Sequence, residues 1–407
     1  MVFSPALALH HTCSTPYIQK DTPLIAKPRS PGNKLLSSRY QFDGRTHIEL
    51  NPVQQASKKA VEQKVNTGVY KFEQVDCPVC GQQHFHALGE KDRYGLYFPV
   101  KVCTNCGLIQ TNPRMTPEAY NEFYNSEYRP LYEGRPEASP EAFQLQYQRG
   151  TRILAYLAQF WSKPAEESFV LEVGCGSGGV LQAFREQGFQ VKGIDLGEEY
   201  LRFGRETYDL DLELGTLADL ELDQTPDIVI YSHVMEHILD VQAEFAAIRE
   251  VLDESGFLFI EVPGVKFIQY TYGGNLLRLL QNAHTYHFTL QSLTNLAQTN
   301  GFRRLTGDEY VRAIFVPAPD SVPSSEIVNE YPAILSFLES VEFEYLLVQG
   351  VTHLQQQRFA QAAIHFAELV DMQPELPYLY QLFATALDQL GRVEDASRIR
   401  HAVANLV

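Results

Sequence analysis

The sequence has no run of 18 or more apolar residues, which is the length that a helix needs to cross a bilayer. Residues 2–9 are apolar, but this stretch is too short for a secretory signal and no basic residue precedes it. We therefore expect a cytoplasmic protein that does not insert into a membrane.

Positive charge is also scarce. The 407 residues hold 33 Lys and Arg against 50 Asp and Glu, a net charge of −17, which disfavours binding to a phosphate backbone. Residues 1–75 are an exception, with ten basic and five acidic side chains, so the rest of the chain carries −22. An acidic body favours a small or weakly charged substrate, and nucleic acid is not the expected partner.

Cysteines are few, and four of the six occur as two Cys-x-x-Cys pairs, while Cys13 and Cys175 stand alone. In a reducing compartment such pairs indicate a metal site rather than disulfides. The pairs lie 22 residues apart, and Gly81 and Gly107 follow them directly. Two such turns make a closed tetrahedral site, so we predict a structural Zn²⁺ bound by Cys77, Cys80, Cys103 and Cys106. Free or redox-active thiols are the alternative.

The length allows two or three folded units, because single cores stop growing at about 250 to 300 residues. Composition and turn signals divide the chain into five predicted segments. They are a flexible lead with one helix starting at Asn51 and Pro52 (1–72), a zinc ribbon (73–115), a helical connector or lid (116–160), an α/β domain (161–318) and a helical region (326–407).

Strands and helices alternate within the α/β domain, a pattern typical of a doubly wound parallel sheet with helices on both faces. The predicted strands are 169–173, 190–195, 227–232 and 257–262, and the helices between them are 180–187, 198–208 and 241–252. After a helix at 290–300, the last two strands, 303–307 and 310–317, are close enough in sequence to form an antiparallel hairpin.

The first of these strands runs into a glycine-rich turn and then a helix, which predicts a nucleotide site. Asp195 ends the second strand, where a carboxylate can accept both ribose hydroxyls. The glycine spacing also satisfies the dinucleotide fingerprint of dehydrogenases. Glu172, two residues before the first glycine, favours instead a ligand that carries an ammonium group.

Three motifs resemble the class I S-adenosylmethionine-dependent methyltransferases: Glu172–Gly178, Gly193–Asp195 and Pro226–Ile238. The resemblance covers residues 150–318 and implies a Rossmann-like sheet of seven strands with the last antiparallel to the others. It also implies S-adenosylmethionine as cofactor. The residues that would bind it are Glu172, Gly174, Cys175, Gly176, Gly178, Asp195, Leu196, Thr216, Leu217 and Ser232.

Two further resemblances lie outside the α/β domain. Residues 106–132 are similar to a zinc-binding lead found before sugar C-methyltransferases and other enzymes of polysaccharide synthesis, which implies a sugar-like acceptor. The last helical region resembles tetratricopeptide repeats, which implies a protein partner, and a plain helical hairpin is the alternative. Its matching positions are Gly350, Phe359, Ala362, Phe366, Pro374, Ala384, Gly391 and Ala396.

Methyl transfer to a hydroxyl or a carbon acid needs a base that removes a proton. His233, Glu236 and His237 follow the third predicted strand, at the edge of the sheet where ligands bind. We predict His237 as the base and Glu236 as its orienting partner, although the pair is equally suited to bracing the loop. His284 and His287 can reach the same cleft. An aromatic segment that includes Tyr124, Tyr128 and Arg129 is a candidate lid over a sugar.

The leading hypothesis is therefore a methyltransferase that acts on a sugar or nucleotide-sugar, at oxygen or carbon. An RNA methyltransferase guided by its ribbon is a second hypothesis, and a non-catalytic scaffold that binds a partner through the repeats is a third. The dehydrogenase alternative predicts that NAD alone stabilises the protein against heat.

Overall fold

The computed structural model describes residues 35–132, 134, 139–318, 323 and 326–403. Residues 1–34 of the predicted lead, with Cys13, and most of the predicted boundary at 317–325 lie outside them. The chain divides into two compact units, which meet in sequence between Tyr345 and Leu346. The first residues that the structure describes belong to the segment predicted to be flexible. That prediction does not fit them, because Leu36, Ser37 and Tyr40 are buried.

The central sheet has seven strands in the order β12-β13-β10-β9-β6-β7-β8, and only β13 runs antiparallel to the rest. This arrangement confirms the predicted seven-stranded sheet. Six strands were predicted to within two residues at each end, while β8 was missed because it is only three residues long. The strands are β6 (Phe169–Val173), β7 (Gln190–Asp195), β8 (Leu212–Leu214), β9 (Ile228–Ser232), β10 (Phe257–Glu261), β12 (Phe302–Gly307) and β13 (Arg312–Pro317).

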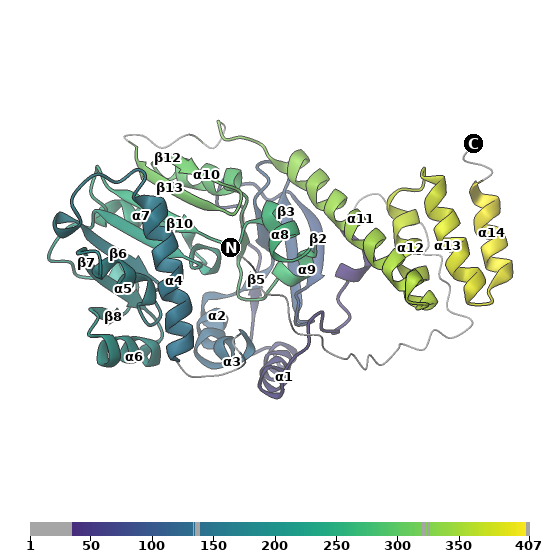
Figure 1. The fold of residues 1–407 in the computed structure, drawn as a ribbon, viewed down its shortest axis with the longest axis horizontal. Helices are drawn as coiled ribbons and strands as arrows, with labels where there is room; N and C mark the ends of the chain where they lie inside the picture. Colours follow the sequence, from purple (N-terminus) through teal and green to yellow (C-terminus); the bar gives the residue numbers. More distant parts are fainter. Residues whose placement is uncertain (1–34, 133, 135–138, 319–322, 324–325, 404–407) are drawn as a thin grey trace. The chain divides into compact units, whose positions relative to one another are not determined.

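Helices cover both faces of this sheet (Figure 1). Alternate residues of a strand point to opposite faces, so each strand contributes to two separate cores. In β9, Val229 packs with α7 (Val241–Val251) and α10 (Leu290–Thr299), whereas Ile228 and Ile230 pack with three other helices. Those are α4 (Pro140–Leu157), α5 (Gly179–Arg185) and α6 (Glu198–Tyr208).

The cysteine-containing segment forms a second sheet, of order β11-β4-β3-β2. Its strands are β2 (Phe85–Lys91), β3 (Tyr97–Cys103), β4 (Ile109–Thr111) and β11 (Tyr286–His287), and β1 (Phe72–Glu73) pairs with β5 (Arg114–Met115) beside it. Since β11 comes from residues after β10, the ribbon is not the separate module predicted for 73–115. The short helices α8 (Ile268–Thr271) and α9 (Leu276–Leu279) also pack in the core of this sheet.

The connector is helical, as predicted. It contains α2 (Pro117–Phe123), a π-helical turn (Tyr124–Tyr128) and α3 (Arg129–Tyr132), followed by α4. The helix α1 (Pro52–Asn66) begins with the predicted cap, because the Asn51 side chain accepts from the backbone N–H of Gln54. Short 3₁₀ turns complete the unit, at Ser38–Tyr40, Ala165–Glu167, Leu217–Asp219, Met235–His237 and Val265–Phe267.

The C-terminal region is helical, with α11 (Tyr331–Gln355), α12 (Phe359–Met372), α13 (Pro377–Gln389) and α14 (Val393–Val403). Gly350 permits close packing, since a Cβ there would lie 2.7 Å from the Phe366 ring. The repeat assignment stays a prediction.

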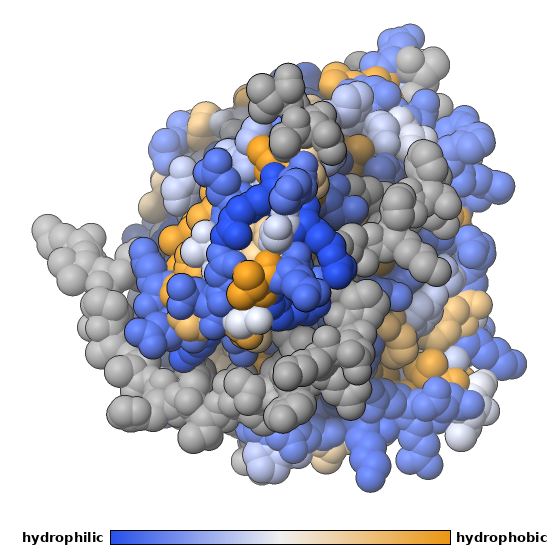
Figure 2. All heavy atoms as spheres, turned by 90° about the vertical axis from the view of Figure 1, so that its right-hand side faces the viewer, coloured by the Kyte–Doolittle hydropathy of each residue, from blue (hydrophilic) through white to orange (hydrophobic). Residues whose placement is uncertain are grey.

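Among the described residues, no helix is long and apolar enough to span a membrane. The described atoms on the face drawn in Figure 2 are mostly hydrophilic, with smaller apolar groups between them.

Candidate active site

The glycine turn joins β6 to α5. Gly174 has φ +70°, and a Cβ there would lie 2.3 Å from a methyl carbon of Val234, so only glycine fits. The turn brings the ends of β6 and β7 together, because the N–H groups of Gly174 and Cys175 both donate to Ile194 O. This places Glu172 and Asp195 on neighbouring strands at the carboxyl edge of the sheet.

The backbone amides of the turn are largely used by the protein itself. Gly176 N donates to Asp195 Oδ2 at 2.9 Å, and Gly179 N, at the start of α5, donates to Gln146 Oε1 at 3.2 Å. We expected these amides to face a ligand. In the structure they bond to the protein instead, because the side chain of Gln146 in α4 caps the start of α5. A pyrophosphate needs such free amides, so the arrangement disfavours the dinucleotide alternative.

Glu172 is 2% exposed, and its Oε2 atom has no hydrogen-bond partner among the described residues. Burial raises the pKa of this carboxyl well above its usual value, and the nearby Arg149 opposes that shift. Ser232, at the end of the adjacent strand β9, likewise has a buried hydroxyl without a partner. Buried polar groups rarely remain unpaired, so this pair fits a ligand that brings an ammonium group.

Asp195 accepts hydrogen bonds from Gly197 N at 2.7 Å and from Gly176 N, and Arg129 Nη2 lies 3.5 Å away. Leu196 beside it is 62% exposed and is free to pack on a ligand. Gly215 N donates to Asp195 O, which brings the predicted residue Thr216 close to the end of β7.

Two residues predicted to bind the cofactor turn their side chains inward. Leu217 and Cys175 are each 2% exposed and belong to the hydrophobic cores. Only their backbone is available to a ligand. Gly178, which has φ +79°, is the N-cap of α5.

His233 follows β9 in the left-handed region, with φ +60°. Its imidazole lies between two carboxylates, with Nδ1 3.6 Å from Glu236 and Nε2 3.4 Å from Glu261. Burial lowers the pKa of His233, but the two carboxylates raise it, and the net shift is upward. His233 therefore favours the charged form and is better suited to bracing the two acids than to acting as a base.

His237 is different, because burial lowers its pKa and keeps the ring neutral near pH 7. Its Nδ1 atom lies 2.5 Å from Tyr124 Oη and 3.1 Å from Ala283 O. Its Nε2 atom lies 3.9 Å from Glu236 Oε1, which is too far for a hydrogen bond. The orienting groups are thus Tyr124 and Ala283 rather than the predicted Glu236. Both oxygens of Glu236 are buried and make no hydrogen bond with any described residue, and His233 Nδ1 lies 3.6 Å from one of them.

The two downstream histidines join this group, as the sequence suggested. The rings of His237 and His284 lie 4.7 Å apart, edge to face, and His284 Nε2 is 4.0 Å from Glu236 Oε1. His287 lies beyond His284, with ring centres 5.7 Å apart. The main-chain bond from Thr285 N to Glu236 O holds the two loops together.

The aromatic connector lies against the histidines. Tyr120 Oη lies 2.6 Å from Ala283 O and 2.8 Å from His237 O, and its one hydrogen can be donated to either carbonyl. The Tyr128 ring lies 5.8 Å from that of His237. Directly after the π-helical turn, at the start of α3, the guanidinium of Arg129 lies 3.6 Å above the Tyr200 ring. The segment therefore contacts both the histidine group and the acid of the glycine turn, which is a suitable position for a lid.

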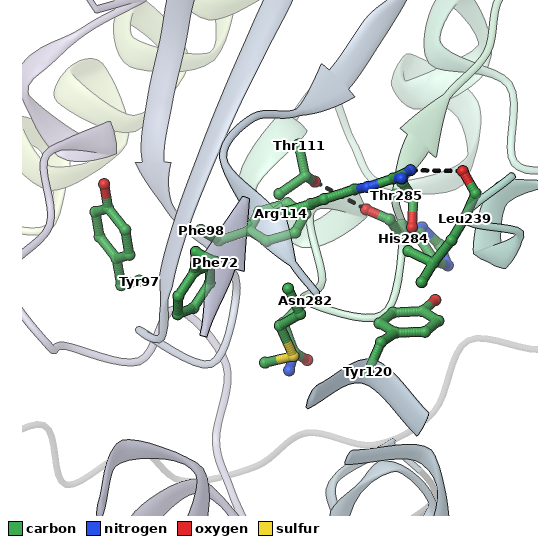
Figure 3. A pocket seen from close by; sticks show the side chains of 11 residues that line it. Phe72, Tyr97, Phe98, Thr111, Arg114, Tyr120, Leu239, Asn282, His284 and Thr285 are labelled. Carbon is green, nitrogen blue, oxygen red and sulfur yellow. Dashed lines mark hydrogen bonds between the residues drawn. The ribbon is translucent and has the colours of Figure 1, made fainter. Parts of the chain in front are cut away.

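A cavity that the sequence did not reveal opens beside His284 (Figure 3). Arg114 extends across it to Leu239 O, and Thr111 Oγ1 donates to His284 O. The amide nitrogen of Asn282 is buried there without a partner. Aromatic rings form much of its wall. The lining residues are Phe72, Tyr97, Phe98, Thr111, Arg114, Met115, Tyr120, Leu239, Asn282, His284 and Thr285.

The four predicted metal ligands come together. Their sulfur atoms all lie within 4.8 Å of one another, with 3.4 Å between Cys77 and Cys106 and 3.5 Å between Cys80 and Cys103. All four are buried and none forms a disulfide. Sulfur atoms at about 2.3 Å from a zinc ion would be separated by similar distances, so the donor set fits tetrahedral Zn²⁺.

Residues 145–306 match the family model described as a methyltransferase domain. The chain is 35% identical over 100 residues to a ubiquinone biosynthesis O-methyltransferase of Idiomarina loihiensis, across 22% of this chain and 40% of that protein. It is 25% identical over 126 residues to an uncharacterized methyltransferase of Staphylococcus carnosus, across 30% of this chain and 59% of that protein. The chain thus spans about half the length of these relatives.

Among solved structures, an S-adenosylmethionine-dependent methyltransferase from Clostridium acetobutylicum is similar, with a TM-score of 0.35 and 12% identity, over 49% of this chain and 99% of that one. The match of residues 145–306 to a methyltransferase domain and the names of these relatives agree with the prediction of a methyltransferase.

Proposed function

We propose that the protein transfers a methyl group from S-adenosylmethionine to a small sugar-like acceptor, with His237 as the base. The proposal is carried by one observation: a glycine turn flanked by an unpaired buried carboxylate, Glu172, and a ribose-type acid, Asp195, lies at the same sheet edge as a neutral histidine. Bound S-adenosylmethionine would supply an electrophilic methyl group on a sulfonium.

Side chains of the protein would bind the cofactor and remove the acceptor's proton. Glu172 would hold the ammonium group and Asp195 the ribose hydroxyls. Ala283 O can only accept a hydrogen bond, so it favours the proton of His237 on Nδ1 and leaves the lone pair on Nε2. That atom would take the acceptor's proton. The carboxylate of Glu236, which lies 3.9 Å from that atom and 3.6 Å from His233, would then stabilise the imidazolium.

The cavity of Figure 3 lies next to the proposed base, because His284 in its wall contacts His237. Aromatic faces, the Arg114 guanidinium and the unpaired Asn282 amide suit a sugar or nucleotide-sugar. The zinc-binding lead supports the same class. The names of the ubiquinone-type relatives favour a second candidate acceptor, an aromatic hydroxyl.

The test is incubation with methyl-labelled S-adenosylmethionine and a panel of nucleotide-sugars and phenols, followed by identification of the labelled product. Label in a sugar supports the proposal, label in a phenol supports the second acceptor class, and transfer to RNA alone would refute both. Failure to bind the cofactor in calorimetry would instead favour the non-catalytic scaffold.

Two variants separate binding from chemistry. Asp195→Ala should abolish cofactor binding, while His237→Gln should keep it and slow turnover by about 10²- to 10⁴-fold. Because burial lowers the pKa of His237, the acid limb of the wild-type rate should lie below pH 6.5. Full-rate transfer by His237→Gln would exclude His237 as the base.

The bound Zn²⁺ is proposed to be structural, since four thiolates leave no open coordination position. Cytoplasmic location and a protein partner for the C-terminal helices remain parts of the proposal.

A further inference from the structure

The ribbon contacts both loops that carry the histidines of the site. One loop follows β9 and contains His237, and the other precedes β11 and contains His284. Strand β4 of the ribbon pairs with β11, and Thr111 of that strand donates its hydroxyl to His284 O at 3.0 Å. Shortly after the first loop, Gln242 of α7 donates to Pro78 O, which lies between two of the cysteines, at 2.7 Å. The ribbon is therefore fastened to the catalytic domain on both sides of the histidine group.

Arg114 of β5 reaches from the ribbon into the first loop (Figure 3). Its Nη1 atom donates to Leu239 O at 2.5 Å, and its Nε atom donates to Glu73 Oε1 at 3.0 Å. The Arg114 side chain is only 14% exposed. Tyr286 of β11 donates its hydroxyl to the same Leu239 carbonyl at 3.1 Å, and this hydroxyl lies 3.3 Å from Arg114 Nη1. One carbonyl, two residues after His237, is thus held by side chains from two different segments.

These bonds join the proposed base to the group that orients it. Leu239 is two residues after His237, and Tyr286 is three residues after Ala283, whose carbonyl oxygen lies 3.1 Å from His237 Nδ1. A hydrogen bond from a guanidinium is stronger than one between neutral groups, and the ion pair with Glu73 holds the guanidinium in place. Arg114 therefore restrains the loop of the imidazole relative to the loop that supplies its hydrogen-bond acceptor.

We propose that Arg114 is a positioning residue, through which the ribbon holds the loop of His237 in the geometry that proton removal needs. This inference rests on the proposed function, because it takes His237 as the base. A displacement of about 1 Å at a reacting group can lower a rate by about 100-fold. Loss of the bond from Arg114 to Leu239 should therefore lower kcat, while the cofactor, which would bind at the glycine turn, should bind as before.

The first experiment compares variants with methyl-labelled S-adenosylmethionine and the acceptor that the panel identifies. Arg114→Gln should lower kcat by about 10- to 100-fold and change the Kd for S-adenosylhomocysteine by less than about 2-fold. Arg114→Lys keeps the charge but loses the fork that reaches Glu73 and Leu239 together, so its kcat should fall between. Tyr286→Phe removes the other bond to the Leu239 carbonyl and should lower kcat by about 3- to 10-fold.

The matched control is Lys91→Gln. Lys91 is another cation of the ribbon whose side chain is largely buried, but it pairs with Asp43 and not with either histidine loop. Its removal should leave kcat within about 2-fold of the wild-type value, because additivity holds for sites without shared partners. Thermal melting of each variant separates a change in the site from a loss of folding.

Amide hydrogen exchange, followed by mass spectrometry, measures the two loops without catalysis. Thr285 N donates to Glu236 O and is a main-chain link between them. Arg114→Gln should speed exchange in residues 235–241 and 283–287 by about 10-fold, as expected for loss of a charged hydrogen bond, and leave the glycine turn at 174–179 unchanged.

The outcomes are distinct. A lower kcat with unchanged cofactor binding and faster exchange in both loops supports the inference. Unchanged kcat in a folded Arg114→Gln protein would overturn it, and so would a raised KM at unchanged kcat, which would make Arg114 an acceptor-binding residue of the neighbouring cavity. Equally faster exchange at the glycine turn would also overturn it. If the wild-type protein transferred no methyl group, the proposed function would fail, while exchange would still decide whether Arg114 holds the two loops.

Discussion

The substitution Gly150→Ala adds one methyl group to α4, and this group has two opposing effects on the stability of the protein. In a helix, alanine is favoured over glycine by about 1 kcal/mol, so Gly150→Ala would ordinarily stabilise α4. Here the added Cβ would lie 2.6 Å from Val180 O, 2.7 Å from Val180 Cα and 3.0 Å from Ala183 Cβ. Two of these neighbours are backbone atoms of α5, which cannot rotate away, so the helices must separate.

Overpacking of this kind costs about 1 to 3 kcal/mol, and losing the bond from Gly179 N to Gln146 costs about 1 kcal/mol more. After the gain in helix propensity is subtracted, we expect Gly150→Ala to destabilise the protein by about 1 to 3 kcal/mol. Because the shift also moves Gln146 away from the turn, the Kd for the cofactor should rise as well.

Thermal melting and calorimetric titration with S-adenosylhomocysteine measure the two effects. The control is Gln148→Ala, an exposed position of α4, where a change within about 0.5 kcal/mol is expected. If Gly150→Ala raised the melting temperature and left the Kd unchanged, then close contact between α4 and α5 would not be what positions the cofactor residues.

Two further predictions concern the supports of the site. Cys80→Ser should lower bound zinc from about one equivalent per chain to near zero by elemental analysis and should expose the ribbon to protease, because the fourth thiolate is lost. Unchanged zinc content would contradict the four-cysteine site. Glu342→Ala should cost about 3 to 5 kcal/mol in urea unfolding, because it leaves Arg39, whose side chain is only 16% exposed, without its carboxylate. A cost below about 1 kcal/mol would show that this ion pair contributes little.

The sequence was most informative where the chemistry is local. Hydrophobic runs that end in glycine or in a charged residue mark the strand boundaries, the turn at Glu172–Gly178 and the position of Asp195. The run and the residue that ends it lie within a few positions of each other. The cysteine pairs were equally clear, because each pair forms on one tight turn. The three-residue strand β8 was missed because a run this short has no recognisable period.

Contacts between distant segments could not be predicted in this way. The bonds that orient His237 come from Tyr124, over a hundred residues earlier, and from Ala283, 46 residues later. The cavity beside His284 combines residues from the ribbon, the connector and the loop before β11. Gln146 was missed for the same reason, since nothing in a glutamine within α4 indicates that its side chain will cap the next α-helix, α5.

The charges of the cysteine-containing ribbon give a last prediction, which tests the hypothesis of an RNA substrate. Residues 73–115 contain four basic and four acidic side chains, so the module has no net charge. Of its cations, Lys91 pairs with Asp43, Arg114 pairs with Glu73, and Arg93 is hydrogen-bonded to Gln281. RNA binding depends on cations that are free to neutralise phosphates. We therefore expect filter binding with structured RNA to give no saturable, salt-dependent complex at 50 mM salt, and a complex whose affinity falls steeply with added salt would restore that hypothesis.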